Sequence, residues 1–286
     1  MRTPTGDSKP AGVSGFSRLH RFHGGLVLES YSGMSTTQPV AAAGIPDELV
    51  IPLQQHVGEI ATPLVQPGDT VLKGQMIAAP QGSVSCPVHA SSSGTVTAIE
   101  PRPFPHPSGM TLQSIVIATD GRDTWQPADT SLADYRQAAP AELLEHLRNA
   151  GIVGLGGAGF PTAVKLANAA SHAIDLLLIN GVECEPYITC DNMLMQERAG
   201  DILEGTRILQ HILRPQQVVI AIEDGMPQAE AAMREAVDAS QVDNIEVVRV
   251  PEIYPSGGER QLIKVLTGRE VPSKGFPADV GIVCQN

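Results

Sequence analysis

The sequence has few aromatic residues, no long apolar run and no excess of basic charge. Aromatic side chains make up 3% of its 286 residues and hydrophobic ones 42%, so aliphatic side chains must fill the cores. No stretch of about 18 apolar residues occurs, so a membrane-spanning helix is not expected. The N-terminus also lacks the apolar core of a signal peptide. These absences predict a cytosolic chain whose link to any membrane is provided by partners.

The charge and the cysteines exclude further classes. A formal net charge of −12 argues against a nucleic-acid partner, because binding to phosphates needs a basic surface. An anionic ligand would then need local backbone donors and one or two well-placed cations. Cys86, Cys184, Cys190 and Cys284 form no C-x-x-C pair, so neither a disulfide framework nor a metal site is predicted.

The chain is long enough for two domains with separate cores. With 28 glycines and 23 prolines, it is expected to form many short elements joined by defined turns. We expect a flexible leader over residues 1–24, an all-β barrel-sandwich domain over 25–135 and an α/β domain over 136–286.

Two turns carry the prediction for the all-β domain. Pro67-Gly68-Asp69 and Lys73-Gly74-Gln75 lie between short apolar alternations, and a similar strand–turn–strand pattern follows over residues 88–99. This pattern resembles the flattened barrel of biotinyl and lipoyl carrier domains. A carrier needs a modifiable lysine at a hairpin tip, and residues 79–87 contain none. We therefore expect a docking or packing module rather than a swinging-arm carrier.

The second half of the chain alternates apolar strands with helices. An amphipathic helix is predicted over 140–151, ending at Gly151. Further helices are expected over 161–170, 192–213, 227–239 and 258–266, and strands over 174–180, 217–222, 245–250 and 280–284. Strands separated by helices predict a parallel, Rossmann-like sheet with crossover helices. Because the chain stops directly after the last strand, we expect further sequence downstream.

A glycine loop precedes the second of these helices. Gly154 to Gly159 match G-x-G-x-x-G, but a helix comes before the loop where a dinucleotide fingerprint needs a strand. The glycines allow close backbone approach and offer N–H donors to an anion. The helix after Pro161 adds its positive N-terminal end, and Lys165 adds a cation. A phosphate site is predicted, with a glycine-rich packing turn as the alternative.

Two polar clusters follow apolar strands. Asn180, Glu183 and Glu185 come after the strand at 174–180, and the segment from Tyr254 to Glu259 follows the strand at 245–250. Ligands of open parallel sheets bind beyond the carboxyl ends of the strands. Carboxylates suit the hydroxyl and amide donors of a ligand better than its phosphate.

Four segments carry a family resemblance: GLGGAGFPTAVKL, NGVECEPYITCD, YPSGGERQLIKVLTG and the final VCQN, with FHGG and IPLQQHVG earlier in the chain. They resemble the C subunit of the Rnf (Rsx) ion-translocating electron-transport complex. The second half is also similar to the flavin-bearing NADH dehydrogenase subunit of respiratory complex I. Three positions depart from the complex I motifs, because Leu155 replaces an arginine, Val182 an aspartate and Gly258 a glutamate.

The resemblance implies an FMN site and an adjoining NADH site. The FMN contacts would come from Gly154, Gly156, Gly157, Lys165, Asn180, Glu183, Cys184, Tyr254, Gly257, Glu259, Gln285 and Asn286. Phe160 would stack on an NADH ring, and Glu185 would contact the nicotinamide side. No general acid or base is needed, because the flavin itself accepts the hydride.

The same resemblance implies a component of an NADH:ferredoxin-type oxidoreductase. It would lie peripherally on the cytoplasmic face of the bacterial inner membrane, with other Rnf/Rsx membrane subunits and ferredoxin or a similar carrier as partners. Family members continue into a region with two 4Fe–4S clusters, whose C-x-x-C-x-x-C-x-x-x-C-P motifs are missing here. The alternative is a non-catalytic scaffold with the same fold, as in the A subunit of sodium-pumping quinone reductase.

Overall fold

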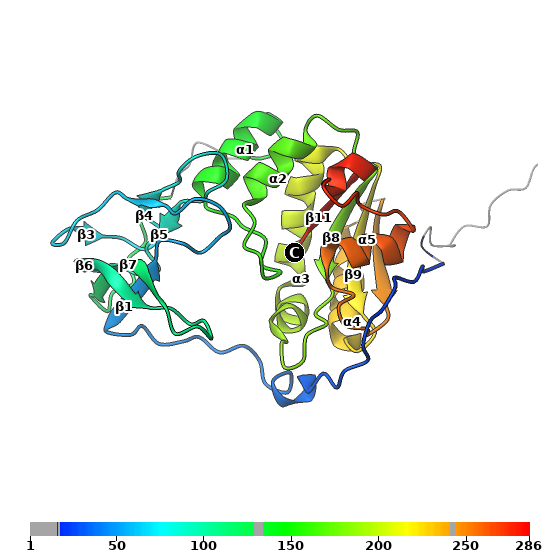
Figure 1. The fold of residues 1–286 in the computed structure, drawn as a ribbon, viewed down its shortest axis with the longest axis horizontal. Helices are drawn as coiled ribbons and strands as arrows, with labels where there is room; N and C mark the ends of the chain where they lie inside the picture. Colours follow the sequence, from blue (N-terminus) through cyan, green and yellow to red (C-terminus); the bar gives the residue numbers. More distant parts are fainter. Residues whose placement is uncertain (1–15, 17, 129–133, 241–243) are drawn as a thin grey trace, which may run out of the picture. The chain divides into compact units, whose positions relative to one another are not determined.

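The computed structural model describes residues 16, 18–128, 134–240 and 244–286 (Figure 1). Its elements are η1 (Ser32–Met34), β1 (Glu48–Pro52), β2 (Thr62–Pro63), β3 (Thr70–Val71), β4 (Met76–Ala79), β5 (Val88–His89), β6 (Gly94–Pro103), β7 (Thr111–Thr119), α1 (Pro140–Asn149), α2 (Thr162–Ala169), β8 (Leu176–Gly181), α3 (Cys190–Leu213), β9 (Gln217–Glu223), α4 (Pro227–Ser240), β10 (Ile245–Val250), α5 (Glu259–Thr267), η2 (Pro277–Val280) and β11 (Ile282–Gln285).

The chain divides into two compact units. The first contains the described residues up to 38, with 178–203 and 217–284; the second contains 39–177, 204–216 and 285–286. Residues 1–15 and 17 of the predicted leader lie outside the described residues. Near the end of that leader, the His20 N–H donates to the Val265 carbonyl at 2.7 Å. The domain boundaries expected from the sequence stay a prediction.

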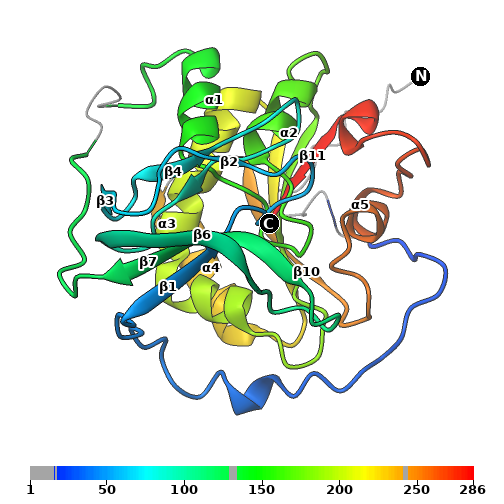
Figure 2. The ribbon, with the colours of Figure 1, turned by 60° about the vertical axis from the view of Figure 1, so that its left-hand side comes forward.

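The all-β part lies within the second unit and consists of two small antiparallel sheets (Figure 2). The first has the strand order β1-β7-β6-β3, and the second has the order β2-β4-β5. The longest pairing joins β6 to β7, from Gly94 opposite Thr119 to Pro103 opposite Thr111, with an irregularity between Val96 and Ala98. The predicted turns at 67–69 and 73–75 lie on either side of β3.

Aliphatic side chains form the core of these sheets. Buried members from both sheets include Ile51, Val71, Ile77, Val96 and Ile117. The strands of both sheets therefore share one core. Its members are aliphatic, as expected for a chain that has few aromatic residues.

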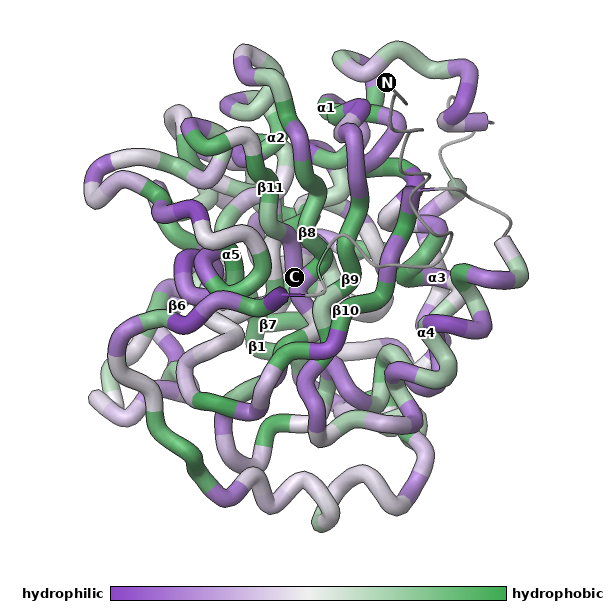
Figure 3. The backbone as a smooth tube through the Cα atoms, turned by 90° about the vertical axis from the view of Figure 1, so that its right-hand side faces the viewer, coloured by the Kyte–Doolittle hydropathy of each residue, from purple (hydrophilic) through white to green (hydrophobic). Residues whose placement is uncertain are grey.

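The α/β part contains a four-stranded sheet with the order β10-β9-β8-β11. Strands β9 and β10 are parallel, from Ile245 opposite Val218 to Val250 opposite Glu223. Helix α4 connects them, which confirms the crossover predicted for this pair. Residues 218–222 of β9 are completely buried, and the strands β8, β9 and β10 are largely coloured as hydrophobic in Figure 3. Polar side chains lie at both ends of β9 and at Asn180 of β8, while β10 carries Glu246 and Arg249 within the strand.

The predicted helices are confirmed to within two residues at each end. Gly151 follows α1 with φ 69°, the left-handed conformation expected of a glycine that ends a helix. One difference lies in α3, where Arg198 leaves helical geometry two residues before Gly200. No helix of the described residues is long and apolar enough to cross a bilayer.

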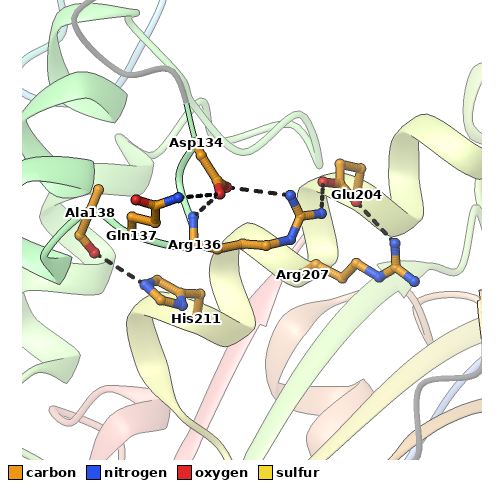
Figure 4. Close-up of polar contacts among 7 residues, drawn as sticks. All are labelled: Asp134, Arg136, Gln137, Ala138, Glu204, Arg207 and His211. Atoms are coloured by element: carbon orange, nitrogen blue, oxygen red, sulfur yellow. Dashed lines mark hydrogen bonds and ion pairs between the residues drawn. The ribbon is translucent and has the colours of Figure 1, made fainter.

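A polar network lies between the segment before α1 and the second half of α3, all within the second unit (Figure 4). Arg136 donates to Glu204 at 2.9 Å, and Arg207 donates to the same carboxylate at 3.1 Å. The ring of His211 lies 3.2 Å from the Ala138 carbonyl oxygen. Because Arg136 is more than half exposed, its ion pair positions the segment more than it stabilises the fold.

Glu230 provides a test of the α4–β10 contact. Its side chain is almost buried and accepts hydrogen bonds from Arg249 of β10 at 3.0 Å and from Arg234 of α4 at 2.9 Å. Burial by itself would raise the pKa of Glu230, but these hydrogen bonds outweigh it and hold the pKa below its ordinary value of 4.5. The ionised Glu230 side chain therefore stabilises the fold at pH values above 4.5, and this stabilisation is lost as the pH falls through the lowered pKa of the folded chain.

We expect Glu230→Gln to reduce the free energy of unfolding at neutral pH by about 1–3 kcal/mol, the scale of hydrogen bonds to charged groups. The difference should shrink in acid, as measured by urea denaturation across pH. Glu235→Gln is the matched control, since Glu235 is an exposed glutamate of the same helix. Equal losses in the two variants at neutral pH would contradict this account.

Candidate functional site

The glycine loop is a closed turn between α1 and α2. Val153 and Pro161 form an isolated β-bridge, and the Gly154 N–H donates to the Phe160 carbonyl at 2.9 Å. The helix that the sequence places before the loop is present as α1. The N–H of Gly154 is therefore used inside the loop, and only later loop residues can offer backbone donors.

Those donors come from Gly156 and Gly157. Among the described residues, neither of their N–H groups has a hydrogen-bond partner. Gly157 and Gly159 have φ angles of 102° and 59°, which favour glycine. A Cβ at Gly159 would also lie 2.9 Å from the Gln55 carbonyl oxygen. The last glycine is thus fixed by packing, while the two before it present free donors.

The end of the chain lies beside this loop. A Cβ at Gly154 would lie 3.3 Å from the Gln285 side-chain nitrogen, and one at Gly156 would lie 3.4 Å from the Asn286 Cβ. Glycines thus keep room between the loop and the two terminal side chains. Gln285 Oε1 and Thr162 Oγ1 are both buried without a hydrogen-bond partner. The free N–H groups, the Thr162 hydroxyl and the start of α2 can all interact favourably with a phosphate, whereas the Gln285 oxygen can accept only from a ligand hydroxyl or N–H group.

Lys165 lies on α2, where its N–H donates to the Pro161 carbonyl at 3.1 Å and its side chain is half-buried. It belongs to the same unit as the glycine loop, Gln285 and Asn286. Phe160, the residue expected to stack on NADH, is half-buried at the end of the loop.

In the first unit, Glu183 caps helix α3. Its carboxylate accepts hydrogen bonds from the Asp191 N–H at 3.0 Å and the Asn192 N–H at 3.1 Å. The Cys190 thiol donates to the same carboxylate at 3.1 Å. A negative charge is favourable at a helix N-terminus. Glu183 therefore fixes the turn between β8 and α3.

Gly257 joins the two polar clusters. Its carbonyl accepts a hydrogen bond from the Asn180 side chain at 2.8 Å, and its N–H donates to the Cys184 sulfur at 3.3 Å. A Cβ at this position would lie 2.3 Å from the Val182 carbonyl oxygen. The second and third predicted clusters are therefore one structural unit, and only glycine fits at their contact.

The thiols of this region remain protonated. Burial, with neighbouring carboxylates, raises the pKa of Cys184 and of Cys190 to about 11. Glu183, Cys190 and Asp191 place three possible metal-ligand atoms within 4.8 Å of one another. These atoms surround the N-terminus of α3, where the helix dipole opposes a cation, so this group is better explained as a helix cap.

The remaining predicted residues lie at the edges of these clusters. Glu185 is exposed next to Cys184, with 3.8 Å between the Cys184 sulfur and a Glu185 carboxylate oxygen. Glu259 is the first residue of α5, directly after Gly258. Tyr254 is partly exposed, and its backbone belongs to a contact that the sequence did not signal.

That contact is made by residues 26–35, which we call the N-terminal strap. Leu26 and Tyr254 exchange two backbone hydrogen bonds of 2.8 Å. Tyr31 stacks on Tyr187 with 4.6 Å between ring centroids, and the Tyr187 N–H donates to the Ser30 carbonyl at 2.7 Å. Both polar clusters are therefore held by one segment from the start of the chain, which has no periodic pattern.

Glu223 is the second feature that sequence reasoning missed. It ends β9, is buried, and has a side-chain oxygen without a partner. Burial and the carboxylates of Glu252, Glu183, Glu185 and Asp224 raise its pKa to about 8. The signal in the sequence is one glutamate directly after an entirely apolar run, which resembles the ordinary end of a strand.

Comparison with known protein families matches the two parts of the chain separately. Residues 20–122 match the family described as the RnfC barrel sandwich hybrid domain, and residues 147–286 match the Nuo51 FMN-binding domain. Together these matches define a class of chain with a barrel-sandwich domain followed by a domain of the FMN-binding type.

Curated relatives identify the family. Proteins named as the C subunit of the ion-translocating oxidoreductase complex are 50% identical over 270 residues in Pseudomonas aeruginosa, 46% over 273 in Vibrio cholerae and 44% over 272 in Pasteurella multocida, each covering 94% of the chain. The chain belongs to this family, as its motifs indicated. The chain spans about a third of the length of these relatives, namely 34%, 34% and 32% in the same order.

Solved structures give a more distant match. A structure of an NAD+-reducing [NiFe]-hydrogenase in the air-oxidized state matches at 25% identity with a TM-score of 0.47, covering 56% of this chain and 31% of that one. This likeness is too distant to carry an inference about function.

Gly257→Ala tests the contact between the two clusters. The added methyl group would overlap the Val182 carbonyl oxygen, so we expect a loss of about 1–3 kcal/mol in the free energy of unfolding, the scale of overpacking. Gly205→Ala is the control, because a Cβ at this helical glycine meets nothing within 4 Å. It should stabilise the chain by about 0.5–1 kcal/mol. Chemical denaturation measures both, and a Gly257 variant as stable as the parent would contradict the close contact.

Proposed function

We propose that this chain binds FMN and acts in NADH-dependent electron transfer within a membrane-bound ion-translocating oxidoreductase complex. The observation that carries the proposal is the glycine loop. Its two free N–H donors and the unpartnered Thr162 hydroxyl lie in the stretch that matches an FMN-binding domain, and the unpartnered Gln285 oxygen there can accept from a ligand hydroxyl. A glycine-rich packing turn does not explain these unpartnered groups.

The phosphate of FMN is assigned to the second unit. Gly156 and Gly157 would donate their backbone N–H groups, and Lys165 and the start of α2 would supply positive charge. Gly154 would serve by leaving space, since its own N–H is already used by Phe160. Gln285 and Asn286 would complete this end with amide groups.

The ring and the ribityl hydroxyls are assigned to the polar clusters. Cys184, Tyr254 and Glu259 would contact them directly. Asn180, Glu183 and Gly257 already hydrogen-bond within the protein, so they would act mainly by fixing the shape of the site. Protonated thiols and carboxylate acceptors suit hydroxyl and amide partners.

NADH would approach with Phe160 stacked on one of its rings and Glu185 near the nicotinamide. Val182 and Gly258 replace acidic residues of the complex I motifs, so the nucleotide would be held by fewer carboxylates here. When bound, FMN supplies the conversion between two-electron and one-electron chemistry. The protein's task is to bind and orient both molecules.

Within the whole protein, electrons would pass to two 4Fe–4S clusters and then to ferredoxin or a similar carrier. The chain would lie on the cytoplasmic face of the inner membrane beside the other Rnf/Rsx subunits. None of the four cysteines here belongs to a cluster motif, so cluster ligands would have to come from sequence outside this chain.

Reduction of bound flavin tests the function. The chain reconstituted with FMN should lose its flavin absorbance band when NADH is added anaerobically, and NADPH serves as the comparison nucleotide. Flavin that binds but is not reduced by NADH would overturn the NADH part of the proposal. Failure to bind FMN at all would overturn the whole proposal and support the scaffold alternative.

Lys165→Ala tests the phosphate assignment. Removal of the cation should weaken FMN binding by about 1–3 kcal/mol, the scale of a charge-assisted hydrogen bond, as measured by calorimetric titration. Riboflavin, which lacks the phosphate, should bind both variants equally. Lys274→Ala is the control at an exposed lysine. An unchanged FMN affinity would remove Lys165 from the site.

A further inference from the structure

Glu223 is an exception among the buried glutamates. Of the described residues, three glutamates are buried, namely Glu183, Glu223 and Glu230. Glu183 accepts three hydrogen bonds at the start of α3, and Glu230 accepts hydrogen bonds from two arginines. Glu223 is 4% exposed, and its Oε1 has no partner. A buried polar atom left unsatisfied is costly, so its retention needs a reason.

The position of Glu223 points to a ligand. It ends β9 after five completely buried apolar residues, and its register partner is Val250, the last residue of β10. Ligands of open sheets bind at this edge. Glu183 and Glu185, which follow β8, and Glu252, which follows β10, are its electrostatic neighbours. Glu223 therefore faces the polar clusters to which the ring of FMN is assigned.

The surrounding charges decide which form of the carboxyl group is present. Glu252, Glu183, Glu185 and Asp224 are its charged neighbours, and Asp224 is itself 3.6 Å from the Arg249 guanidinium. Burial, followed by these like charges, raises the pKa of Glu223 to about 8. At neutral pH the side chain is then a neutral acid with one O–H donor. A metal ion would compete with that proton, whereas an acceptor atom would use it.

We infer that Glu223 donates a hydrogen bond from its carboxylic acid to an acceptor atom of the bound flavin ring. This inference rests on the proposed function. The ring offers carbonyl oxygens and imine nitrogens, which are neutral acceptors tolerated among carboxylates. The contact would satisfy the buried oxygen and give the site a binding residue that none of the sequence motifs contains. It is a binding contact, and no proton needs to leave Glu223 during hydride transfer.

Riboflavin is the probe that tests this contact, because the phosphate of FMN titrates near neutral pH and would obscure the result. Its dissociation constant is measured by fluorescence quenching about one pH unit below and above the pKa of Glu223, which stays below the range in which the flavin ring and tyrosines titrate. For the unaltered chain, affinity should fall about fivefold at the higher pH, because one hydrogen bond is worth about tenfold and about a tenth of the carboxyl groups stay protonated. Glu223→Gln keeps a neutral donor and should bind equally at both pH values. Glu223→Leu should bind about tenfold more weakly than the unaltered chain at the lower pH.

Glu252→Gln is the matched control for charge. It removes a neighbouring carboxylate, so the midpoint of the pH dependence should move down while affinity at low pH stays unchanged. An independent readout is the infrared carboxylic-acid band that distinguishes the unaltered chain from Glu223→Gln. This band should be present at neutral pH and should shift when riboflavin is added, whatever the folding of the leucine variant.

Three outcomes would overturn the inference. They are a riboflavin affinity that does not depend on pH, an unchanged affinity in folded Glu223→Leu, and a carboxylic-acid band that flavin does not shift. In each of these the chain still binds flavin, so the proposed function survives. Only the absence of FMN and riboflavin binding by the unaltered chain would overturn both.

Discussion

The Glu183 carboxylate at the start of α3 is the contact on which the polar clusters depend. Two backbone N–H groups and the Cys190 thiol donate to it. That cap ties the turn after β8 to the start of α3, and in the same turn the Cys184 sulfur accepts a hydrogen bond from the Gly257 N–H. If these hydrogen bonds were broken, the buried Glu183 carboxylate and the first N–H groups of α3 would both be left without partners. A residue predicted to bind a ligand therefore first acts to hold the site's backbone in place.

The same turn explains why the N-terminal strap can hold two clusters together. Tyr187 lies within the capped turn, and Tyr254 lies after β10. The strap stacks on the first and pairs with the backbone of the second. Since Asn180 and Gly257 already connect those clusters from inside, the strap adds a second, outer connection. The arrangement is over-determined, as a preorganised binding site requires.

Much of the fold follows from periodicity and punctuation in the sequence. The strand 245–250 was predictable from its apolar run, and the helix that begins at Pro140 from its apolar spacing, its proline start and its glycine end. The glycine loop was predictable from the spacing of its glycines. Contacts between distant segments were not, because the Leu26–Tyr254 bridge is made by backbone groups that any side chains would permit.

Glu183 and Glu223 show the same limit within the site. Both are glutamates that follow a strand, and the sequence treats them alike. In the structure one carboxyl group accepts from three donors, while the other has an oxygen without a hydrogen-bond partner and carboxylates as its charged neighbours. The difference arises from tertiary surroundings, which sequence spacing does not encode. Family motifs drew attention to the first glutamate and not to the second.

Charge also decides which chemical group of a ligand each of the two sets of residues can accept. The phosphate of FMN carries about two negative charges at neutral pH. Glu183, Glu185, Glu252 and Asp224 surround Glu223, and a phosphate among them would be repelled. The backbone donors of Gly156 and Gly157 provide the opposite environment, with no carboxylate among the loop residues 154–159. The loop therefore suits the anionic group of a ligand, and the surroundings of Glu223 suit a neutral, hydrogen-bonding group. A protonated Glu223 suits a neutral acceptor group, because an ionised Glu223 would also repel the acceptor atoms of a flavin ring.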